Sequence, residues 1–439
     1  MNPIASSRSL ENMALMVASD RAPATTERDR SQLPVAPKKE RVFFYKLNQM
    51  RIFPALLVFV THVEFYKAYV GIIPLESVLP LAHWGHQSLS FFFVLSGFLI
   101  TYLMLYEQLK TGRVNIRNFY ARRMLRVWPL YYLILAIAFF VVPWVFHYNP
   151  VKAYIAVACR NKLLTHFVNA LLLYIFILPN VSLARKFYVN CGGQSWTVGV
   201  EEQFYLFWPL LLSMCRKRPW LMMLGSIFCK LLILSIFDAL SHCALAVNRT
   251  HLTDTLAKCT SFVLRFDVEG LALGSIGAYL LLYKPQSLFV RLVTHTVAWV
   301  LSFAPLLIIP TLPPNEDWLN YGLRDFCFAI CYACLIIKLA KSSSALTTGL
   351  GKLLNYLGTI CYGFYMYHIL AICILLEILT HCKGMNDCGI LFNVLLYTGS
   401  LALALVFSIL SYEFYESRFL KLKSRFSYVL TDPAPQTTG

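Results

Sequence analysis

The sequence predicts an all-α polytopic membrane protein: a transmembrane helical bundle of about ten spans, with one further segment that enters the membrane and returns. Three observations predict this class. Of the 439 residues 58% are hydrophobic, only 14% are charged, and the mean hydropathy is +0.59. So little polar surface could not cover the exterior of a water-soluble protein. The apolar residues also gather in long runs, as membrane-spanning helices require.

The net charge of +17 comes from 39 Lys and Arg residues against 22 Asp and Glu residues. In a water-soluble protein this excess would suggest a nucleic-acid partner. In a membrane protein it usually reports basic cytoplasmic loops beside anionic lipid. We therefore expect the lipid bilayer, and no nucleic acid, as a partner.

Residues 1–44 carry Ser, Pro, Thr and charges of both signs without apolar periodicity. No short apolar segment there is followed by a small-residue cleavage site, so we expect a disordered cytoplasmic tail and no cleaved signal peptide. The transmembrane domain is expected over 45–426, and a second disordered tail over 427–439.

Eleven apolar runs are candidate membrane spans. In chain order they are 50–70, 89–106, 124–146, 163–179, 196–214, 220–247, 261–283, 288–310, 324–340, 353–379 and 390–412. Six Lys and Arg residues lie between positions 110 and 126, around the start of the third run. This charge places the connection between the second and third runs in the cytoplasm, and the N-terminus with it.

Charge also indicates which runs cross the membrane. If all eleven crossed, the basic clusters at 216–218 and 421–425 would both face outward, against the positive-inside tendency. The run 163–179 is short and holds His166 and Asn169, so we expect it to enter the membrane and return. Ten spans then remain, and both termini are cytoplasmic.

Six cysteines form three possible pairs in or beside the predicted outer loops. They are Cys159 with Cys191, Cys243 with Cys259, and Cys382 with Cys388. Disulfide bonds made in an oxidising compartment would explain the pairing. Small apolar cysteines are also common in membrane helices, and the sequence leaves both explanations open.

Arg51 and His62 are the first candidate catalytic residues. The stretch RIFPALLVFVTH places a cation at one membrane face and an imidazole roughly 16 Å deeper along a helix. Ionisable side chains inside a span are costly, and they usually line a polar path or a functional site. The alternative is a neutral histidine whose ring nitrogens are satisfied by neighbouring helices.

Further polar residues are expected in the outer halves of later spans. Trp196 opens a span that carries the adjacent carboxylates Glu201 and Glu202, which point about 100° apart on a helix. Asp267 and His368 lie at a similar outer depth in later spans. These five residues would line the acceptor side of a site, or they would brace the helices through ion pairs and hydrogen bonds.

Arg122, Arg123 and Arg126 stand at the predicted cytoplasmic start of the third span. Arg123 and Arg126 share one helix face, and two guanidinium groups together match a phosphate or pyrophosphate. The alternative is ordinary positive-inside anchoring. Basic groups inside, an imidazole at mid-depth and carboxylates outside would suit a phosphate-bearing donor and a hydroxylated acceptor. No metal site is expected.

Six blocks of the sequence resemble, in the same order, the motifs of the acyltransferase-3 family. They are LNQMRIFPALLVFVTH, SFFFVLSGFLI, FYARRMLRVWPLYY, SWTVGVEEQFYLFWPLLL, YGFYMYHIL and SYEFYESRF. The resemblance covers about 45–426. Members of that family are integral-membrane O-acyltransferases that modify sugars on polysaccharides, lipopolysaccharide, peptidoglycan and secondary metabolites.

The resemblance implies roles for particular residues. An arginine and a histidine thought essential in the family fall on Arg51 and His62, and Arg126 completes the RxxR motif that the family associates with acyl-CoA. Glu416 matches a glutamate that often follows the last span. The sequence departs from the family at Asn48, where an aspartate is common.

The expected function is therefore transfer of an acyl group, most simply acetyl, from cytoplasmic acyl-CoA to a hydroxyl of a carbohydrate or lipid-linked glycan. His62 would take the hydroxyl proton, or would itself carry the acyl group. Acyl-CoA is a co-substrate, and no bound cofactor is expected. The family's usual home is the bacterial cytoplasmic (inner) membrane, although the outer cysteines would also suit a eukaryotic secretory membrane.

A transporter or proton-coupled permease is the main alternative, with the same buried histidine and carboxylates relaying protons or binding solute. Such proteins are often built from internal repeats with interrupted helices at corresponding positions. The two halves of this sequence show no such pairing. A receptor without chemistry would leave the depth of His62 and the inward arginine pair unexplained.

Overall fold

The structure is a computed structural model that describes residues 40–73, 75, 84–145, 163–301, 304, 318–342, 348–382 and 389–430. Most of the two predicted tails lies outside these residues. Helix dominates the described part of the chain, which confirms the predicted all-α class.

The described part of the chain contains a series of helices and helical turns. In chain order they are α2 (Tyr45–Met50), α3 (Ile52–Tyr69), α4 (Gly85–Thr111), α5 (Ile116–Ala136), the π-helical turn η3 (Ile137–Val141), α6 (Val142–Val145), α8 (Leu163–Ile175), α9 (Pro179–Ala184), the 3-10 turn η4 (Gly193–Ser195), α10 (Trp196–Met214), α11 (Pro219–Ala246), α12 (Thr250–Arg265), α13 (Val268–Tyr283), α14 (Leu288–Thr294), α15 (Thr296–Leu301), α17 (Trp318–Lys341), α18 (Gly349–His381), α19 (Gly389–Ser411), the π-helical turn η6 (Tyr412–Glu416), α20 (Ser417–Lys423) and the 3-10 turn η7 (Ser424–Phe426).

Six helical segments in the described part are long and apolar enough to cross a membrane. They are Gly85–Thr111, Ile116–Val141, Pro219–Ala246, Thr250–Tyr283, Gly349–His381 and Gly389–Phe426. These segments support an integral membrane protein. The count of ten spans and the cytoplasmic position of both termini stay predictions.

Two predicted runs have helices that differ from a simple span. Over the described part of 288–310, α14 ends before His295, whose backbone is extended, and α15 begins at Thr296. The polar sequence Thr294-His295-Thr296 interrupts the apolar run at this point. In 163–179 the helix α8 has 13 residues, which is about 20 Å and shorter than the hydrocarbon thickness. That length fits the predicted re-entrant segment, which stays a prediction.

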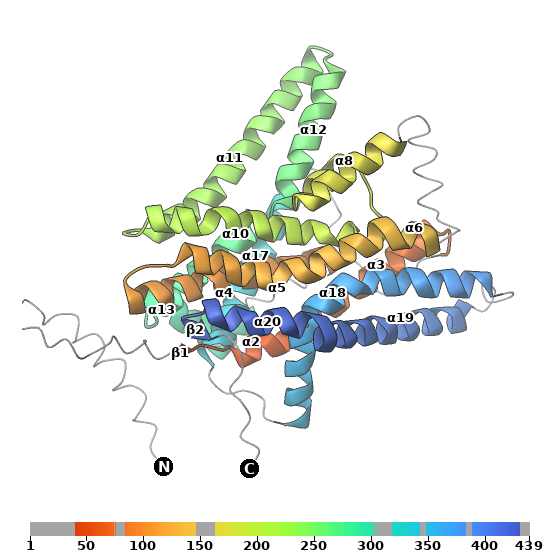
Figure 1. Ribbon diagram of the computed structural model, residues 1–439. Helices are drawn as coiled ribbons and strands as arrows, with labels where there is room; N and C mark the ends of the chain where they lie inside the picture. Colours follow the sequence, from red (N-terminus) through yellow and green to blue (C-terminus); the bar gives the residue numbers. More distant parts are fainter. Residues whose placement is uncertain are drawn as a thin grey trace, which may run out of the picture. The chain divides into compact units, whose positions relative to one another are not determined.

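The long helices of the bundle lie side by side in Figure 1, where α3, α4, α5, α10, α18 and α19 follow roughly one direction. Helix α4 packs against α3, α13 and α17, and α18 packs against α3 and α19. Helices α11 and α12 form a hairpin that leans away from this group. Separate apolar clusters fill the spaces between the helices, and the site described below lies among α3, α5, α10 and α18.

Two glycines let α4 and α13 approach closely. A Cβ atom at Gly97 would lie 2.0 Å from the carbonyl oxygen of Leu271, and one at Gly274 would lie 1.9 Å from that of Val94. Small residues at such crossings allow helix backbones to touch in membrane proteins. Next to this contact the Thr101 hydroxyl donates to Ser275 Oγ across the same seam, at 2.8 Å.

The cysteines that lie in the described residues are free thiols, including Cys191, Cys243, Cys259 and Cys382. The possible disulfide between Cys243 and Cys259 is therefore not formed in this structure. Cys243 lies three residues before the end of α11, whereas Cys259 lies nine residues into α12, so the two are offset along the hairpin by roughly 9 Å. The other two suggested partners, Cys159 and Cys388, lie outside the described residues.

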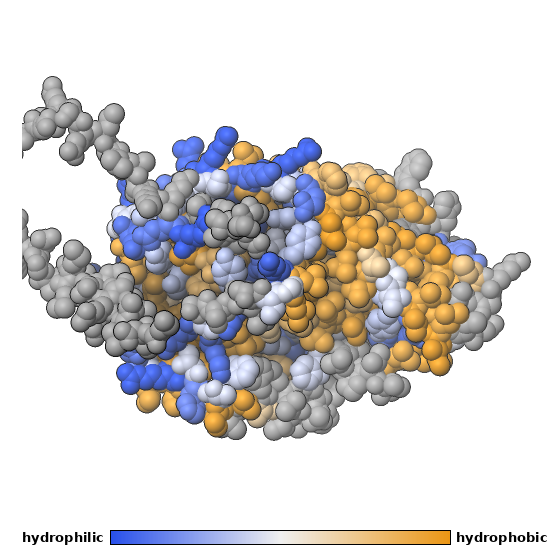
Figure 2. Space-filling model, turned by 90° about the horizontal axis from the view of Figure 1, so that it is seen from below, coloured by the Kyte–Doolittle hydropathy of each residue, from blue (hydrophilic) through white to orange (hydrophobic). Residues whose placement is uncertain are grey.

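A two-residue parallel sheet joins the two ends of the described chain. Strand β1 (Glu40–Arg41) pairs with β2 (Val429–Leu430). Glu40 also accepts hydrogen bonds from Tyr106 and Lys110 of α4, and these, the Tyr106 bond first, hold the pKa of the Glu40 carboxyl below its usual value. In Figure 2 polar surface gathers on the side that carries β1, β2 and α20, and apolar surface covers the opposite side.

Candidate active site

Two histidines from distant parts of the chain meet inside the bundle. His62 of α3 and His368 of α18 have ring centroids 4.9 Å apart, and His62 Nδ1 lies 3.1 Å from His368 Nε2. His368 is 1% exposed, whereas His62 keeps part of its surface accessible. The sequence singled out both residues, and the structure places them in contact.

The register of α2 and α3 against α18 sets this contact. Asn48 Nδ2 donates to the backbone oxygen and to Oδ1 of Asn355, both at 2.8 Å. Gly358 lies so close that a Cβ there would be 1.9 Å from the Asn48 carbonyl oxygen. The same parallel register continues along the helices to the histidine pair. An aspartate at position 48, which the family resemblance led us to expect, could not donate these bonds.

A second layer holds two arginines and two carboxylates. Arg51 lies in the neighbourhood of Arg126 and Glu201, and Arg126 in that of Glu416, but among the described residues none of these oppositely charged pairs approaches to within 4 Å. These four residues come from the α2–α3 junction, α5, α10 and η6. The structure therefore gathers four of the sequence-predicted site residues at one level of the bundle.

Both carboxylates of this layer are held by hydroxyl donors. Ser96 donates to Glu201 Oε1 and Tyr205 donates to Glu201 Oε2, each at 2.8 Å. Ser411 donates to Glu416 Oε1 at 2.8 Å. With their oxygens fixed in this way, the carboxylates can orient the guanidinium groups beside them.

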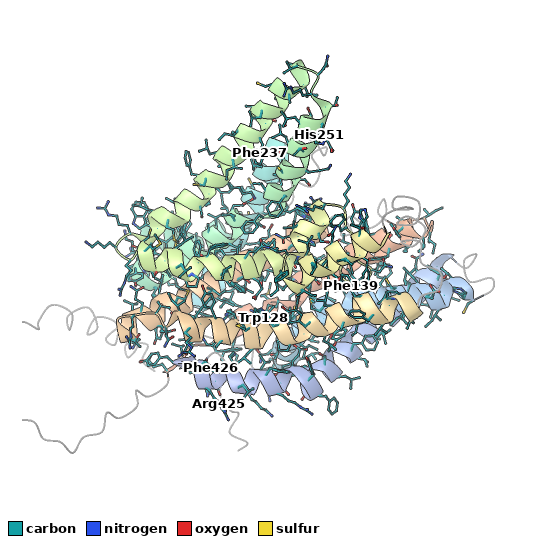
Figure 3. All side chains as sticks on the ribbon, turned by 45° about the horizontal axis from the view of Figure 1, so that its top comes forward. Trp128, Phe139, Phe237, His251, Arg425 and Phe426 are labelled. Atoms are coloured by element: carbon teal, nitrogen blue, oxygen red, sulfur yellow. The ribbon has the colours of Figure 1, made fainter. Side chains whose placement is uncertain are left out.

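Glu202 points away from this layer, as adjacent residues on a helix do. Trp128 Nε1 donates to its Oε2 at 2.9 Å. Figure 3 shows Trp128 on α5. The buried Oε1 of Glu202 has no hydrogen-bond partner among the residues that the structure describes. Glu202 therefore lies close to the site, and only one of its two carboxylate oxygens has a hydrogen-bond partner among the described residues.

The inner arginines divide into two kinds. Arg122 donates to Glu107 Oε2 at 3.2 Å and to the Phe426 carbonyl oxygen at 2.7 Å. Phe426 ends the turn η7, which follows α20, and Figure 3 shows it near α5. Arg123 instead lies over the rings of Phe119 and Tyr205, at 5.8 and 5.7 Å. Its buried Nε has no hydrogen-bond partner within the described ranges.

A small cleft opens beside these arginines. Its lining residues are Leu103, Glu107, Arg122, Arg123, Lys423 and Val429. Two arginines and a lysine against one carboxylate make the cleft basic, but its volume of about 10 Å³ has room for roughly one water molecule and not for a phosphate group in this structure. The sequence predicted the arginines, whereas Lys423 was predicted only as part of the basic C-terminal segment.

Two predicted residues belong to other surroundings. Trp196 packs on Phe93, with ring centroids 6.3 Å apart. Asp267 caps the start of α13 through the Gly270 amide at 2.9 Å and accepts from Ser90 at 3.1 Å. A neighbouring ion pair, Lys230 with Glu269 at 2.7 Å, ties α11 to α13. This set fits the bracing alternative for the outer acidic residues.

One buried ion pair was not predicted from the sequence. Glu64 and Lys67 of α3 are completely buried and form an ion pair at 3.0 Å. Tyr397 donates to Glu64 at 2.6 Å, and the Leu75 amide donates to the same carboxylate. Opposite charges three residues apart in an apolar run could have revealed the pair. Within the described residues no group of three His, Cys, Asp or Glu side chains could hold a metal ion.

The basic cleft, the charged residues around Arg51 and the histidine pair occupy successive regions of the bundle. The basic cleft and Arg123 lie toward the side that carries β1 and β2, and the histidine pair lies further along α3. Such a series can bind a phosphate-bearing molecule at one end and bring a reactive group to an imidazole.

Comparisons with known proteins agree with this chemistry. A protein of Staphylococcus aureus strain MRSA252, provisionally named an O-acetyltransferase, is 24% identical over 365 residues, which cover 79% of this chain and 55% of that protein. A protein of strain COL with the same provisional name is 24% identical over 352 residues, which cover 77% of this chain and 53% of that protein. The O-acetyltransferase OatA of strain NCTC 8325 is 27% identical over 151 residues, or 34% of this chain and 24% of that protein.

The chain spans about half the length of the first two of these relatives. No solved structure matches it. The family model described as an acyltransferase domain matches residues 44–413, which is most of the chain. The chain therefore belongs to the acyltransferase-3 family.

Proposed function

We propose that the protein is a membrane O-acyltransferase that moves an acetyl group from cytoplasmic acetyl-CoA to a hydroxyl of a carbohydrate or lipid-linked glycan. One observation supports this proposal: His62, which keeps accessible surface, follows Arg51 along α3, and Arg126 and Glu201 lie in the neighbourhood of Arg51. Acetyl is chosen because the similar proteins are named O-acetyltransferases.

The donor binds from the cleft side. CoA carries several phosphates, and guanidinium groups bind phosphate oxygens through paired, charge-assisted hydrogen bonds. Arg123 is the best placed residue, because its buried Nε lacks a hydrogen-bond partner in the part of the chain that is described. Arg122 is already engaged by Glu107 and Phe426, so it shapes the cleft instead.

The thioester then lies between the charged layer and His62. Arg51 and His62 are eleven residues apart, or roughly 16 Å along a helix, and the thiol-bearing arm of CoA extends across part of this distance. Arg51 is too far from His62 to reach the thioester oxygen during attack, so its positive charge is available to the part of CoA that lies behind the thioester. Glu201, whose two oxygens accept from Ser96 and Tyr205, adds negative charge in the neighbourhood of that guanidinium.

Transfer proceeds by attack of the acceptor oxygen on the thioester carbon. His62 takes the hydroxyl proton as the new C–O bond forms, the C–S bond breaks, and the proton passes to the departing thiolate of CoA. In the second possible route His62 attacks the thioester itself, and the acceptor then attacks the acyl-histidine. Both routes need an unprotonated His62 nitrogen facing the substrate.

Labelled acetyl transfer tests the proposal. Membranes that contain equal amounts of wild type, His62→Ala or His381→Ala are incubated with acetyl-CoA labelled in the acetyl group, and label in glycans and lipids is counted. His381 is a matched control, because it is exposed at the end of α18 and bonds only its own helix at Glu377. We expect full transfer with His381→Ala and a loss of about 100-fold or more with His62→Ala.

Two results would contradict the proposal. Undiminished transfer by His62→Ala would remove His62 from the mechanism. A wild type that transfers no label, but moves a solute or protons across vesicles in a His62-dependent manner, would favour the permease.

A further inference from the structure

Hydrogen-bond partners fix where the protons of the two histidines lie. His368 Nδ1 is 2.6 Å from the carbonyl oxygen of Tyr365, which can only accept, so Nδ1 carries the proton and Nε2 of the neutral ring is an acceptor. His62 Nδ1 is 3.0 Å from the Val58 carbonyl oxygen and 3.1 Å from that acceptor. Since both neighbours accept, His62 Nδ1 must donate. The lone pair of His62 is thereby assigned to Nε2.

Burial separates the roles of the two rings. His368 is 1% exposed and is enclosed by Phe364, which stacks at 6.3 Å, and by Tyr365 at 5.5 Å. A substrate cannot reach it. His62 retains accessible surface, so only His62 of the pair can meet a hydroxyl or a thioester.

We propose that His368 is the positioning residue for His62. It accepts the Nδ1–H bond of His62, keeps Nε2 of His62 free of its proton, and stabilises the imidazolium that forms when Nε2 takes a proton from the acceptor. The Nδ1 proton stays on His62 throughout. This role rests on the proposed function.

The choice of an imidazole as acceptor follows from the surroundings. In water-soluble hydrolases a buried carboxylate orients the catalytic histidine and stabilises its charged form. Inside a bilayer an ionised carboxylate is costly to place, whereas a neutral imidazole offers a basic acceptor without a permanent charge. Val58 alone could orient a neutral ring, but a second acceptor matters more once His62 is positively charged, because hydrogen bonds from charged donors are stronger.

Two substitutions at position 368 test this role through rates. Glutamine places its Oε1 near the position of the imidazole Nε2 and can accept from His62, whereas leucine of similar size cannot. We expect His368→Leu to lower kcat about 10- to 100-fold with little change in KM, the size of one charge-assisted hydrogen bond. His368→Gln is expected to keep kcat within about fivefold of wild type. An unchanged kcat in His368→Leu, or equal losses in both variants, would overturn the role.

Nitrogen NMR tests the same role without any substrate. Protein labelled with ¹⁵N-histidine is reconstituted in lipid, and the His62 signals are assigned by their loss in His62→Gln. We expect a protonated Nδ1 and a bare Nε2 in wild type and in His368→Gln, and a mixture of tautomers in His368→Leu. A protonated Nε2 in wild type would refute the positioning role. The expected tautomers in a protein that transfers no acetyl group would instead refute the proposed function.

Discussion

Glu201 is a site residue whose two carboxylate oxygens both accept hydrogen bonds from neighbouring hydroxyl groups. Its two oxygens accept from Ser96 and from Tyr205, and it faces Arg51 and Arg126. A carboxylate with both oxygens fixed can hold a guanidinium in one orientation. Because two helices supply the donors, the orientation of Glu201 depends on the packing of α4 against α10.

Removal of one donor is expected to slow transfer. Tyr205→Phe keeps the ring that Arg123 contacts but deletes the hydroxyl that donates to Glu201. Loss of a hydrogen bond to a charged group costs about 1.5–3 kcal/mol, so initial rates of labelled acetyl transfer should fall roughly 10- to 100-fold. Tyr132→Phe is the control, since its hydroxyl donates only to the Ile175 carbonyl at the bundle surface. Equal rates in the two variants would show that Glu201 needs no fixed orientation.

At this scale the sequence could identify charged residues but not their partners. Arg51, His62 and Glu201 stand out because ionisable side chains are rare inside apolar runs. Ser96 and Tyr205 are ordinary residues of membrane helices; Tyr205 lies one turn from Glu201 on α10, whereas Ser96 meets Glu201 only after α4 has packed against α10. The contact between His62 and His368 was likewise invisible, because the register of α3 against α18 decides it.

The seam between α4 and α13 is the element contact with the least tolerance. Gly97→Val would force its side chain into the Leu271 backbone, which cannot move aside as a flexible side chain can. We expect a loss of about 3 kcal/mol or more, measured as a lower midpoint of thermal unfolding in detergent. Gly225→Val in α11 is the control, because no atom lies within 4 Å of a Cβ at that glycine. A Gly97→Val midpoint equal to that of the control would mean that the helices can separate without cost.

The elements were predictable where hydrophobicity alone decides them. The predicted run 196–214 has the same bounds as α10, and 220–247 differs from α11 by one residue at each end. The run 288–310 was predicted less well, because an average over a window hides the polar break at His295. The run 261–283 is split at Asp267, whose side chain caps α13 in place of continuing the helix.

The orientation of the whole molecule in the membrane follows from charge, and free cysteines can report it. Cys215 lies exposed after α10, on the predicted cytoplasmic side, and Cys243 and Cys382 lie exposed near the predicted outer side. We expect a membrane-impermeant maleimide to label Cys243 and Cys382 in intact cells, and Cys215 only after permeabilisation, as read by peptide mass spectrometry. Buried Cys361 should stay unlabelled throughout. Labelling of Cys215 in intact cells would contradict its predicted cytoplasmic position and therefore the predicted topology.

At the scale of the molecule the sequence predicted a helical membrane bundle, and the structure agrees. The sequence could not determine how many helices cross the membrane. Length and hydropathy identify six helical segments in the described part that could cross, and they do not decide whether shorter helices such as α8 do. The strand pair β1–β2 also escaped prediction, because two residues on each side carry no periodic signal.

The strand pair has a consequence for the order in which the protein is made. Every layer of the site draws on the final part of the chain: His368 for the histidine pair, Glu416 for the charged layer, and Lys423 and Val429 for the cleft. While a ribosome is still adding these residues, the earlier helices already sit in the bilayer with Arg51 and His62 unaccompanied. On the function proposed above, the nascent chain has no complete site until this last part of the chain, which includes β2, has been added.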